Sequence, residues 1–301
     1  KSLGNSIEPE DILKKYGADI LRIWVTASNY AEDLRVDHAI LEQHAESYRK
    51  IRNTFRYLLG NLNDKFETQD FTSLNTKELS ELEKYMLHQL CILNESFIKN
   101  FEAYNFHILY KDLLIFCTVE LSAFYFDIRK DTLYCDPKNS KKRSSSIKVL
   151  QIILESLVSW FAPILSFTTE EIFRLVNKES NKSIHLNKFV KIPQNWKNET
   201  LEKKWAVLKK IRNVSNISIE EKRSEKIIGS SLEANIKIKL KKELYEVAKD
   251  SDFAEICITS GAEIINDENI SDEIAVETSK AEGKKCSVCW KIKKGKCERH
   301  G

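Results

Sequence analysis

The chain has 301 residues, of which 42% are hydrophobic, and its formal net charge is +3. This length predicts two or three compact units rather than one small domain. The small net charge excludes a generally basic body, so any nucleic-acid binding must use local patches. The sequence lacks a long apolar run and a signal peptide, and it starts with Lys1, so we expect part of a longer cytoplasmic protein without a membrane partner.

Two short helices are expected near the N-terminus. Pro9 suits the first turn of a helix, and Gly17 can end that helix directly after Tyr16. A second helix is predicted through Ile20–Val25.

Apolar residues recur at helical spacing over most of residues 41–176. The positions that share helix faces are Ile51, Phe55, Leu58 and Leu62; Leu79, Leu82, Met86, Leu90, Leu93 and Phe97; Leu109, Leu113, Phe116 and Phe124; and Ile147, Leu150, Leu154 and Leu157. On the first of these helices, Arg49, Arg52 and Arg56 lie away from the apolar face and form a basic side. The pattern predicts an antiparallel helical bundle.

The last helix of this region is predicted to begin at Thr168. Thr168 and Glu171 match a capping box, and Phe167 with Ile172 would form its hydrophobic staple. Residues 178–198 are polar and predict a connector.

The next part of the chain changes from helical to alternating spacing. A further amphipathic helix is expected around Leu201–Ile211, and the alternation over Leu232–Leu240 predicts a half-exposed strand. A short helix near Glu243–Lys249 and strands near Ile256–Ile258 and Ile274–Val276 would complete a small α/β unit.

The last 16 residues hold three of the seven cysteines. Cys286, Cys289, Cys297 and His300 have the spacing C-x2-C-x7-C-x2-H, which lets three thiolates and an imidazole surround one Zn²⁺ tetrahedrally. All four ligand positions are filled, so we expect a structural site. Such a short segment would take much of its folding energy from the metal. The alternative is a disordered basic tail with reactive cysteines.

Charge is unevenly distributed around this predicted site. Ala281–Gly301 holds seven Lys or Arg residues against Glu282 and Glu298, whereas Glu263–Glu277 holds six carboxylates and no base. Trp290 directly follows the second cysteine, where it could stack on an unpaired base or pack beneath the ribbon. The acidic stretch would repel phosphate, so we expect it to face away from a bound RNA.

Other motifs are weaker. The basic loop Asp136–Arg143 could contact phosphate or be a solvated loop, and Lys1–Asn5 is too short to carry a function alone. The sequence near the six histidines does not suggest a nucleophilic triad, and it contains no glycine loop of the kind that holds phosphate. We therefore expect no catalysis completed within this chain.

Several stretches together resemble the class I isoleucyl-tRNA synthetases. They are Lys1–Pro9, Tyr48–Leu62, Phe124–Asp131, Ala162–Ile172, Glu221–Arg223 and Ile228–Ala234. The first resembles the end of the Lys-Met-Ser-Lys-Ser signature, and the others resemble the anticodon-binding bundle and the module after it. Valyl and leucyl enzymes share the bundle, but a terminal zinc ribbon favours the isoleucyl family. That family usually has four cysteines at this site, whereas His300 is the last ligand here.

The resemblance implies a mainly α fold in four parts. The anticodon-binding helical bundle is followed by a small α/β module and a C-terminal zinc ribbon. The implied bounds are 1–40 for the end of the catalytic domain, 41–198 for the bundle, 199–280 for the α/β junction module and 281–301 for the ribbon.

The resemblance also implies the function. The intact enzyme, expected to be a monomer, would activate isoleucine with ATP and Mg²⁺ and transfer it to tRNA-Ile. Lys1 would stabilise the triphosphate charge as pyrophosphate leaves. This chain alone would be inactive and would recognise the anticodon region of tRNA. The alternatives are another class I synthetase of the valyl type and a non-catalytic RNA-binding zinc-ribbon protein.

Two sets of residues are the predicted tRNA contacts. The first is the basic side formed by Arg49, Arg52 and Arg56. The second combines Lys222 and Arg223 with Trp290 and Arg299. Each of these side chains could instead belong to an ordinary solvated surface.

Overall fold

The computed structural model describes all residues except 1–7, 63–70, 72–73, 179–181 and 301. The chain divides into two units, the first formed by Lys1–Asp127 and Lys141–Lys197 and the second by Ile128–Ser140 and Asn198–Gly301.

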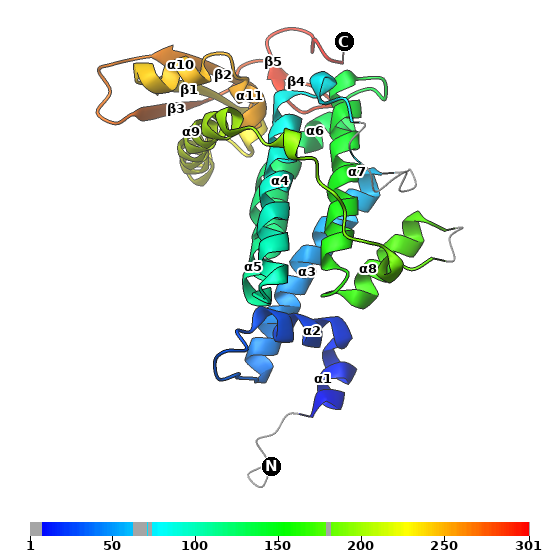
Figure 1. The fold of residues 1–301 in the computed structure, drawn as a ribbon. Helices are drawn as coiled ribbons and strands as arrows, with labels where there is room; N and C mark the ends of the chain where they lie inside the picture. Colours follow the sequence, from blue (N-terminus) through cyan, green and yellow to red (C-terminus); the bar gives the residue numbers. More distant parts are fainter. Residues whose placement is uncertain (1–7, 63–70, 72–73, 179–181, 301) are drawn as a thin grey trace. The chain divides into compact units, whose positions relative to one another are not determined.

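Unit 1 is helical (Figure 1). Its elements are α1 (Pro9–Tyr16), α2 (Ala18–Ala27), α3 (His38–Asn61), η1 (Thr76–Glu78), α4 (Glu81–Glu102), α5 (Phe106–Ile115), the π-helix η2 (Phe116–Phe126), α7 (Lys141–Phe161), α8 (Ser166–Val176), η3 (Ile184–Leu186) and η4 (Gln194–Trp196). Gly17 has a φ of +85° and ends α1 as the sequence predicts, because glycine adopts this conformation without a steric penalty.

The core of unit 1 lies between α3, α4, α5, η2 and α7, which pack along one another (Figure 1). The predicted apolar faces supply it: Ile51, Phe55 and Leu58 of α3 are each at most 1% exposed. Phe55 meets Phe161 of α7 edge to face, with ring centroids 5.9 Å apart. The predicted helical bundle is therefore confirmed.

The start of α8 differs from its prediction. The helix begins at Ser166, so Thr168 lies inside the first turn and does not cap it. The cap comes from Asp19 of α2, whose carboxylate accepts hydrogen bonds from the Thr168 backbone N–H (2.9 Å) and hydroxyl (2.6 Å). Phe167 is 69% exposed, so it forms no staple. The predicted capping box is wrong because a tertiary contact takes the place of the local one.

Unit 2 combines helices with two small sheets. Its elements are α6 (Asp127–Cys135, whose first residue belongs to unit 1), α9 (Glu199–Ser224), η5 (Ser231–Glu233), β1 (Ala234–Leu240), α10 (Lys242–Ala248), α11 (Phe253–Ile256), β2 (Gly261–Asn266), β3 (Ile274–Lys280), β4 (Lys284–Lys285) and β5 (Ile292–Lys293). β1 is central in the sheet order β2-β1-β3, parallel to β2 and antiparallel to β3.

The alternation in β1 is confirmed by its burial. Ile236 and Ile238 are buried, and α9 packs against β1 and β3. The strand predicted at Ile256–Ile258 is wrong. Asp252 caps the short helix α11 by accepting from the Glu255 N–H (3.1 Å), and Ile258 has a φ of +57°, which no strand accommodates. The strand starts later, at Gly261.

None of the helices in the described part of the chain is both long and apolar enough to cross a membrane.

Candidate metal centre and RNA-binding surface

The C-terminal ribbon, residues 281–300, carries its predicted ligands on two tight turns, Cys286–Trp290 and Cys297–His300, and the second is closed by the His300 N–H donating to the Cys297 carbonyl (3.1 Å). Gly283 has a φ of +132°, and a Cβ there would collide with the backbone of Lys293. The Trp290 N–H donates to the Cys286 carbonyl (3.1 Å), which closes the turn between the first two cysteines. The strands β4 and β5 pair from Lys284 to Lys293 and complete the ribbon.

These turns bring the four predicted metal ligands together. One ligand atom from each of Cys286, Cys289, Cys297 and His300 lies within 4.8 Å of all the others. The Nδ1 atom of His300 is 3.6 Å from the Cys286 sulfur and 3.5 Å from the Cys297 sulfur. The Cys289 and Cys297 sulfurs are 3.9 Å apart. The cluster could therefore hold a metal ion.

The electrostatics of the ribbon favour thiolates at two positions. Backbone N–H groups of Cys289 and Val288 lower the pKa of the Cys286 thiol to about 6. The backbone N–H of Arg299 similarly lowers the pKa of Cys297. Burial raises the pKa of Cys289 to about 11. Because metal ligands must be deprotonated, the first two groups suit a cation site, and Cys289 would need the cation itself to lose its proton.

The ribbon also contacts the end of α6 within the same unit. The Nε2 atom of His300 is 3.1 Å from the carbonyl oxygen of Cys135, the last residue of α6. The guanidinium of Arg299 forms ion pairs with the carboxylates of Asp131 and Asp136. The prediction that Arg299 contacts phosphate is not supported by this geometry, because two carboxylates already neutralise it. Although burial opposes the shift, these carboxylates raise the pKa of Arg299.

Sequence reasoning missed the α6 side of this contact. Asp136 belongs to the loop interpreted as basic, and Asp131 belongs to a stretch that carries only the family resemblance. Arg299 and Asp131 lie 168 residues apart, so no local pattern links them.

The basic side predicted on α3 is exposed in unit 1. Arg49 lies 3.4 Å from Glu42 and 3.2 Å from Glu46, so its charge is partly neutralised. Arg52 and Arg56 are exposed, and in the described ranges no carboxylate forms an ion pair with them. They are the more available cations of the three.

In the second predicted set, the two cations of α9 are paired with carboxylates, whereas Trp290 is exposed. Lys222 pairs with Glu225 and Arg223 with Glu220, in both cases at 2.6 Å. Trp290 is 59% exposed, so it does not pack beneath the ribbon, and the Lys285 ammonium lies 5.5 Å from its ring centroid. The remaining predicted site residue, Lys1, lies outside the described residues.

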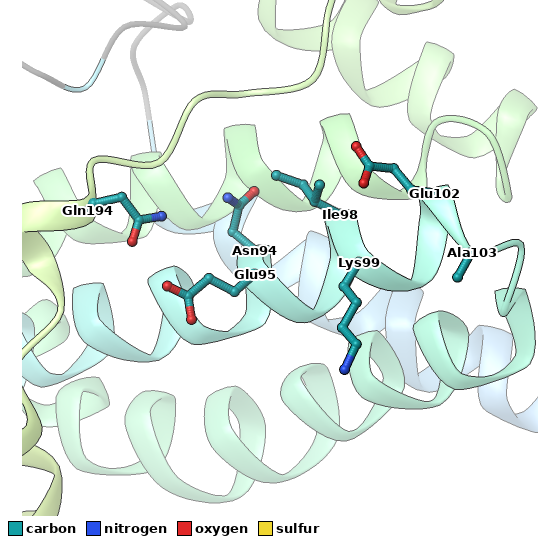
Figure 2. A pocket seen from close by; sticks show the side chains of 7 residues that line it. All are labelled: Asn94, Glu95, Ile98, Lys99, Glu102, Ala103 and Gln194. Carbon is teal, nitrogen blue, oxygen red and sulfur yellow. The ribbon is translucent and has the colours of Figure 1, made fainter.

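A shallow pocket runs along α4 of unit 1 (Figure 2). Its volume is about 600 Å³, and its lining is Asn94, Glu95, Ile98, Lys99, Glu102, Ala103 and Gln194. Two carboxylates against one ammonium make this lining unsuited to phosphate. Glu95 is paired with Lys197 at 2.9 Å, which neutralises one of the two carboxylates but leaves no excess of positive charge.

Comparison with known families shows which family the chain belongs to. Residues 83–239 match the model of the anticodon-binding domain of tRNA ligases, and residues 1–37 match that of the class I tRNA synthetases (I, L, M and V). The first match covers more than half of the chain. The chain belongs to this tRNA ligase family.

Individual relatives within the family are isoleucine–tRNA ligases. The chain is 67% identical to that of Pelagibacter ubique (strain HTCC1062) over 300 residues, which are 100% of this chain and 33% of that protein. The enzyme of Agrobacterium fabrum is 43% identical (97% of this chain, 31% of that protein), and the enzyme of Geobacter sulfurreducens is 40% identical (96% and 32%).

The chain thus spans about a third of the length of these curated relatives and aligns with a C-terminal part of them. The resemblance to isoleucyl-tRNA synthetases inferred from the sequence is confirmed.

A solved structure supports the fold. The leucyl-tRNA synthetase (LeuRS) of Agrobacterium radiobacter K84, in a ternary complex with tRNA and LeuAMS, superimposes with a TM-score of 0.50 at 17% identity. The match covers 66% of this chain and 22% of that one. At this identity the likeness concerns the fold alone.

Proposed function

We propose that this chain is the part of an isoleucyl-tRNA synthetase that recognises the anticodon region of tRNA-Ile. The observation that carries the proposal is the 67% identity to the Pelagibacter ubique enzyme across the whole chain. The intact enzyme would work in the cytoplasm as a monomer, activating isoleucine with ATP and Mg²⁺ before transfer to tRNA. Lys1 would stabilise the leaving pyrophosphate there.

The metal of the ribbon is proposed to be structural Zn²⁺. A tetrahedral zinc ion with ordinary Zn–S and Zn–N bond lengths sets its sulfurs about 3.8 Å apart and each sulfur about 3.6 Å from the nitrogen. Three of the six separations match these values: 3.9 Å for the sulfurs of Cys289 and Cys297, and 3.5 and 3.6 Å from His300 Nδ1 to the sulfurs of Cys297 and Cys286. No pair of ligand atoms is more than 4.8 Å apart. Three thiols and an imidazole leave no position for a reacting water, so the ion would stabilise the ribbon.

Two groups of residues are proposed as tRNA contacts. Arg52 and Arg56 on α3 would meet backbone phosphates, since both are exposed and their charges are not neutralised by a described carboxylate. Trp290 would stack on an unpaired base, with Lys285 near its ring adding positive charge. Arg49, Lys222 and Arg223 would contribute less, because each would have to exchange a carboxylate partner for phosphate.

The test is the affinity of the chain, with zinc supplied, for tRNA-Ile and for the same tRNA with an altered anticodon, at one stated salt concentration. We expect at least tenfold weaker binding to the altered tRNA. Equal affinity for both would contradict anticodon recognition and leave a nonspecific RNA-binding protein.

The matched variants address the α3 contacts. Replacing Arg52 and Arg56 with Ala should weaken binding. It should also make the slope of log affinity against log salt concentration less steep by about 0.7 for each phosphate that the variant no longer neutralises. Replacing the exposed Arg35 and Lys178 with Ala changes the net charge equally and should leave both quantities unchanged. Equal losses of affinity in the two double variants would show that total charge, and not the α3 face, is sensed.

A further inference from the structure

His300 lies between the metal ligands and a helix end. Its Nδ1 atom faces the sulfurs of Cys286 and Cys297 at 3.6 and 3.5 Å, while its Nε2 atom is 3.1 Å from the Cys135 carbonyl oxygen. A neutral imidazole carries one N–H. With the proton on Nε2, His300 donates to Cys135 and keeps the Nδ1 lone pair for a metal.

The carbonyl that receives this bond belongs to a helix end. Cys135 is the last residue of α6, and the last carbonyls of a helix have no partner inside the helix. His300 supplies one such partner from 165 residues away. The Cys135 thiol in turn lies 3.6 Å from the Val288 carbonyl of the ribbon.

Arg299 extends the contact to both sides of this carbonyl. Its guanidinium donates hydrogen bonds to the Asp131 carboxylate, one turn earlier in α6, and to the Asp131 carbonyl (3.3 Å). It also bonds Asp136, the first residue after the helix. Asp136 accepts from the Ser140 hydroxyl at 3.2 Å, so the turn 136–140 is anchored to the same arginine.

We infer that His300 is a positioning residue through which the metal of the ribbon fixes the C-terminal end of α6 and the turn 136–140. A metal on Nδ1 holds the imidazole in one orientation and keeps the proton on Nε2. Without the metal neither the orientation of the ring nor its tautomer would be fixed, so the bond to Cys135 would be made only part of the time. A cysteine at position 300 would ligate the metal but has no second donor for the helix.

This inference rests on the proposed metal site, and the two fail separately. Metal content of the full chain is measured first, by metal analysis after purification with zinc. A chain without stoichiometric metal overturns the proposed site, and the inference with it. A chain with one metal and an unaffected α6 overturns the inference alone.

The test is amide hydrogen exchange of the full chain, monitored in a peptide covering residues 131–140. Removing the metal with a chelator should raise exchange in this peptide at least tenfold, while α4 of unit 1 stays unchanged. The His300→Cys variant should keep its metal and a protected ribbon, yet show the same faster exchange in 131–140. Exchange as slow as in the wild type in this metal-bound variant would overturn the inference.

A second variant leaves all four ligands in place. Changing Asp131 and Asp136 to Asn removes the charges that hold Arg299 and should also speed exchange in 131–140, with metal content unchanged. Changing the exposed Asp250 and Asp272 to Asn alters the net charge equally and should have no effect there. If both double variants behave like the wild type, the bonds of Arg299 do not order the turn 136–140, and the inference fails for that turn even where His300→Cys loses its metal.

Discussion

The helical unit and the C-terminal ribbon are stabilised by different means. Unit 1 buries large side chains completely, among them Phe55, Trp160 and Phe161, each at most 1% exposed. In residues 281–300 the buried side chains are those of Ala281 and Cys289. So small an apolar interior cannot offset the conformational entropy of folding, and cross-links must do so. Substitutions in the ribbon should therefore change metal binding, whereas substitutions in the core of unit 1 should change the stability of its helices.

The largest effect is expected from Cys289→Ser, which removes a buried metal ligand. Structural zinc sites contribute about 10 kcal/mol or more of apparent folding free energy to small ribbons, so this ribbon should lose its metal and unfold. Metal analysis and exchange of ribbon amides would show the loss, while the thermal unfolding of the helices followed by circular dichroism stays unchanged.

Cys135→Ser is the control for that change, because this thiol is close to the ribbon but is not a ligand. It should retain the metal. A stable, protected ribbon in Cys289→Ser would contradict the view that the metal replaces a core.

Phe161→Ala should produce the reverse signature. The side chain is fully buried and its ring meets Phe55, so its removal leaves a cavity that costs about 3 to 5 kcal/mol. Urea unfolding of the helical signal should shift by this amount, with metal content unchanged. Metal loss in the same transition as the helical signal would mean that the helical unit and the ribbon do not unfold independently.

This contrast also explains how far the sequence could predict the structure. Core faces such as Ile51, Phe55 and Leu58 follow from helical spacing, because a helix must bury its apolar stripe. The ligand set Cys286, Cys289, Cys297 and His300 follows from spacing too, since short loops hold the four groups close together.

The features that the sequence did not predict are contacts between distant residues. Asp19 caps α8 from 149 residues away, and Arg299 meets Asp131 across 168 residues. Polar pairs of this kind leave no periodic signal, and each partner has a plausible local role. The strand misplaced at Ile256–Ile258 has the same cause on a smaller scale, because the apolar run there packs as the end of a short helix.

Asp19→Ala tests one of these contacts and should have a smaller effect than the core substitution. Asp19 is 8% exposed, and its carboxylate accepts hydrogen bonds from the Thr168 N–H and hydroxyl, so its loss leaves donors at the start of α8 unsatisfied. We expect a loss of about 1 to 3 kcal/mol in urea unfolding of the helical signal. Asp33→Ala, in an exposed loop, removes the same charge and should change stability by less than about 0.5 kcal/mol.

Trp290→Gly distinguishes stability from function inside the ribbon and has the smallest effect on stability. Trp290 has a φ of +62°, a conformation that costs a residue with a side chain roughly 1 kcal/mol more than glycine. The variant should therefore release its metal to a chelator more slowly than the wild type.

If the exposed ring stacks on a base, affinity for tRNA-Ile should nevertheless fall by about 1 to 3 kcal/mol. Trp290→Phe keeps both an aromatic ring and the strained backbone, so it should retain most of the affinity without the gain in metal retention. Unchanged affinity in Trp290→Gly would show that the strained, exposed tryptophan is not a stacking residue. Faster metal release would show instead that its side chain supports the ribbon, as the buried aromatic rings support the helical unit.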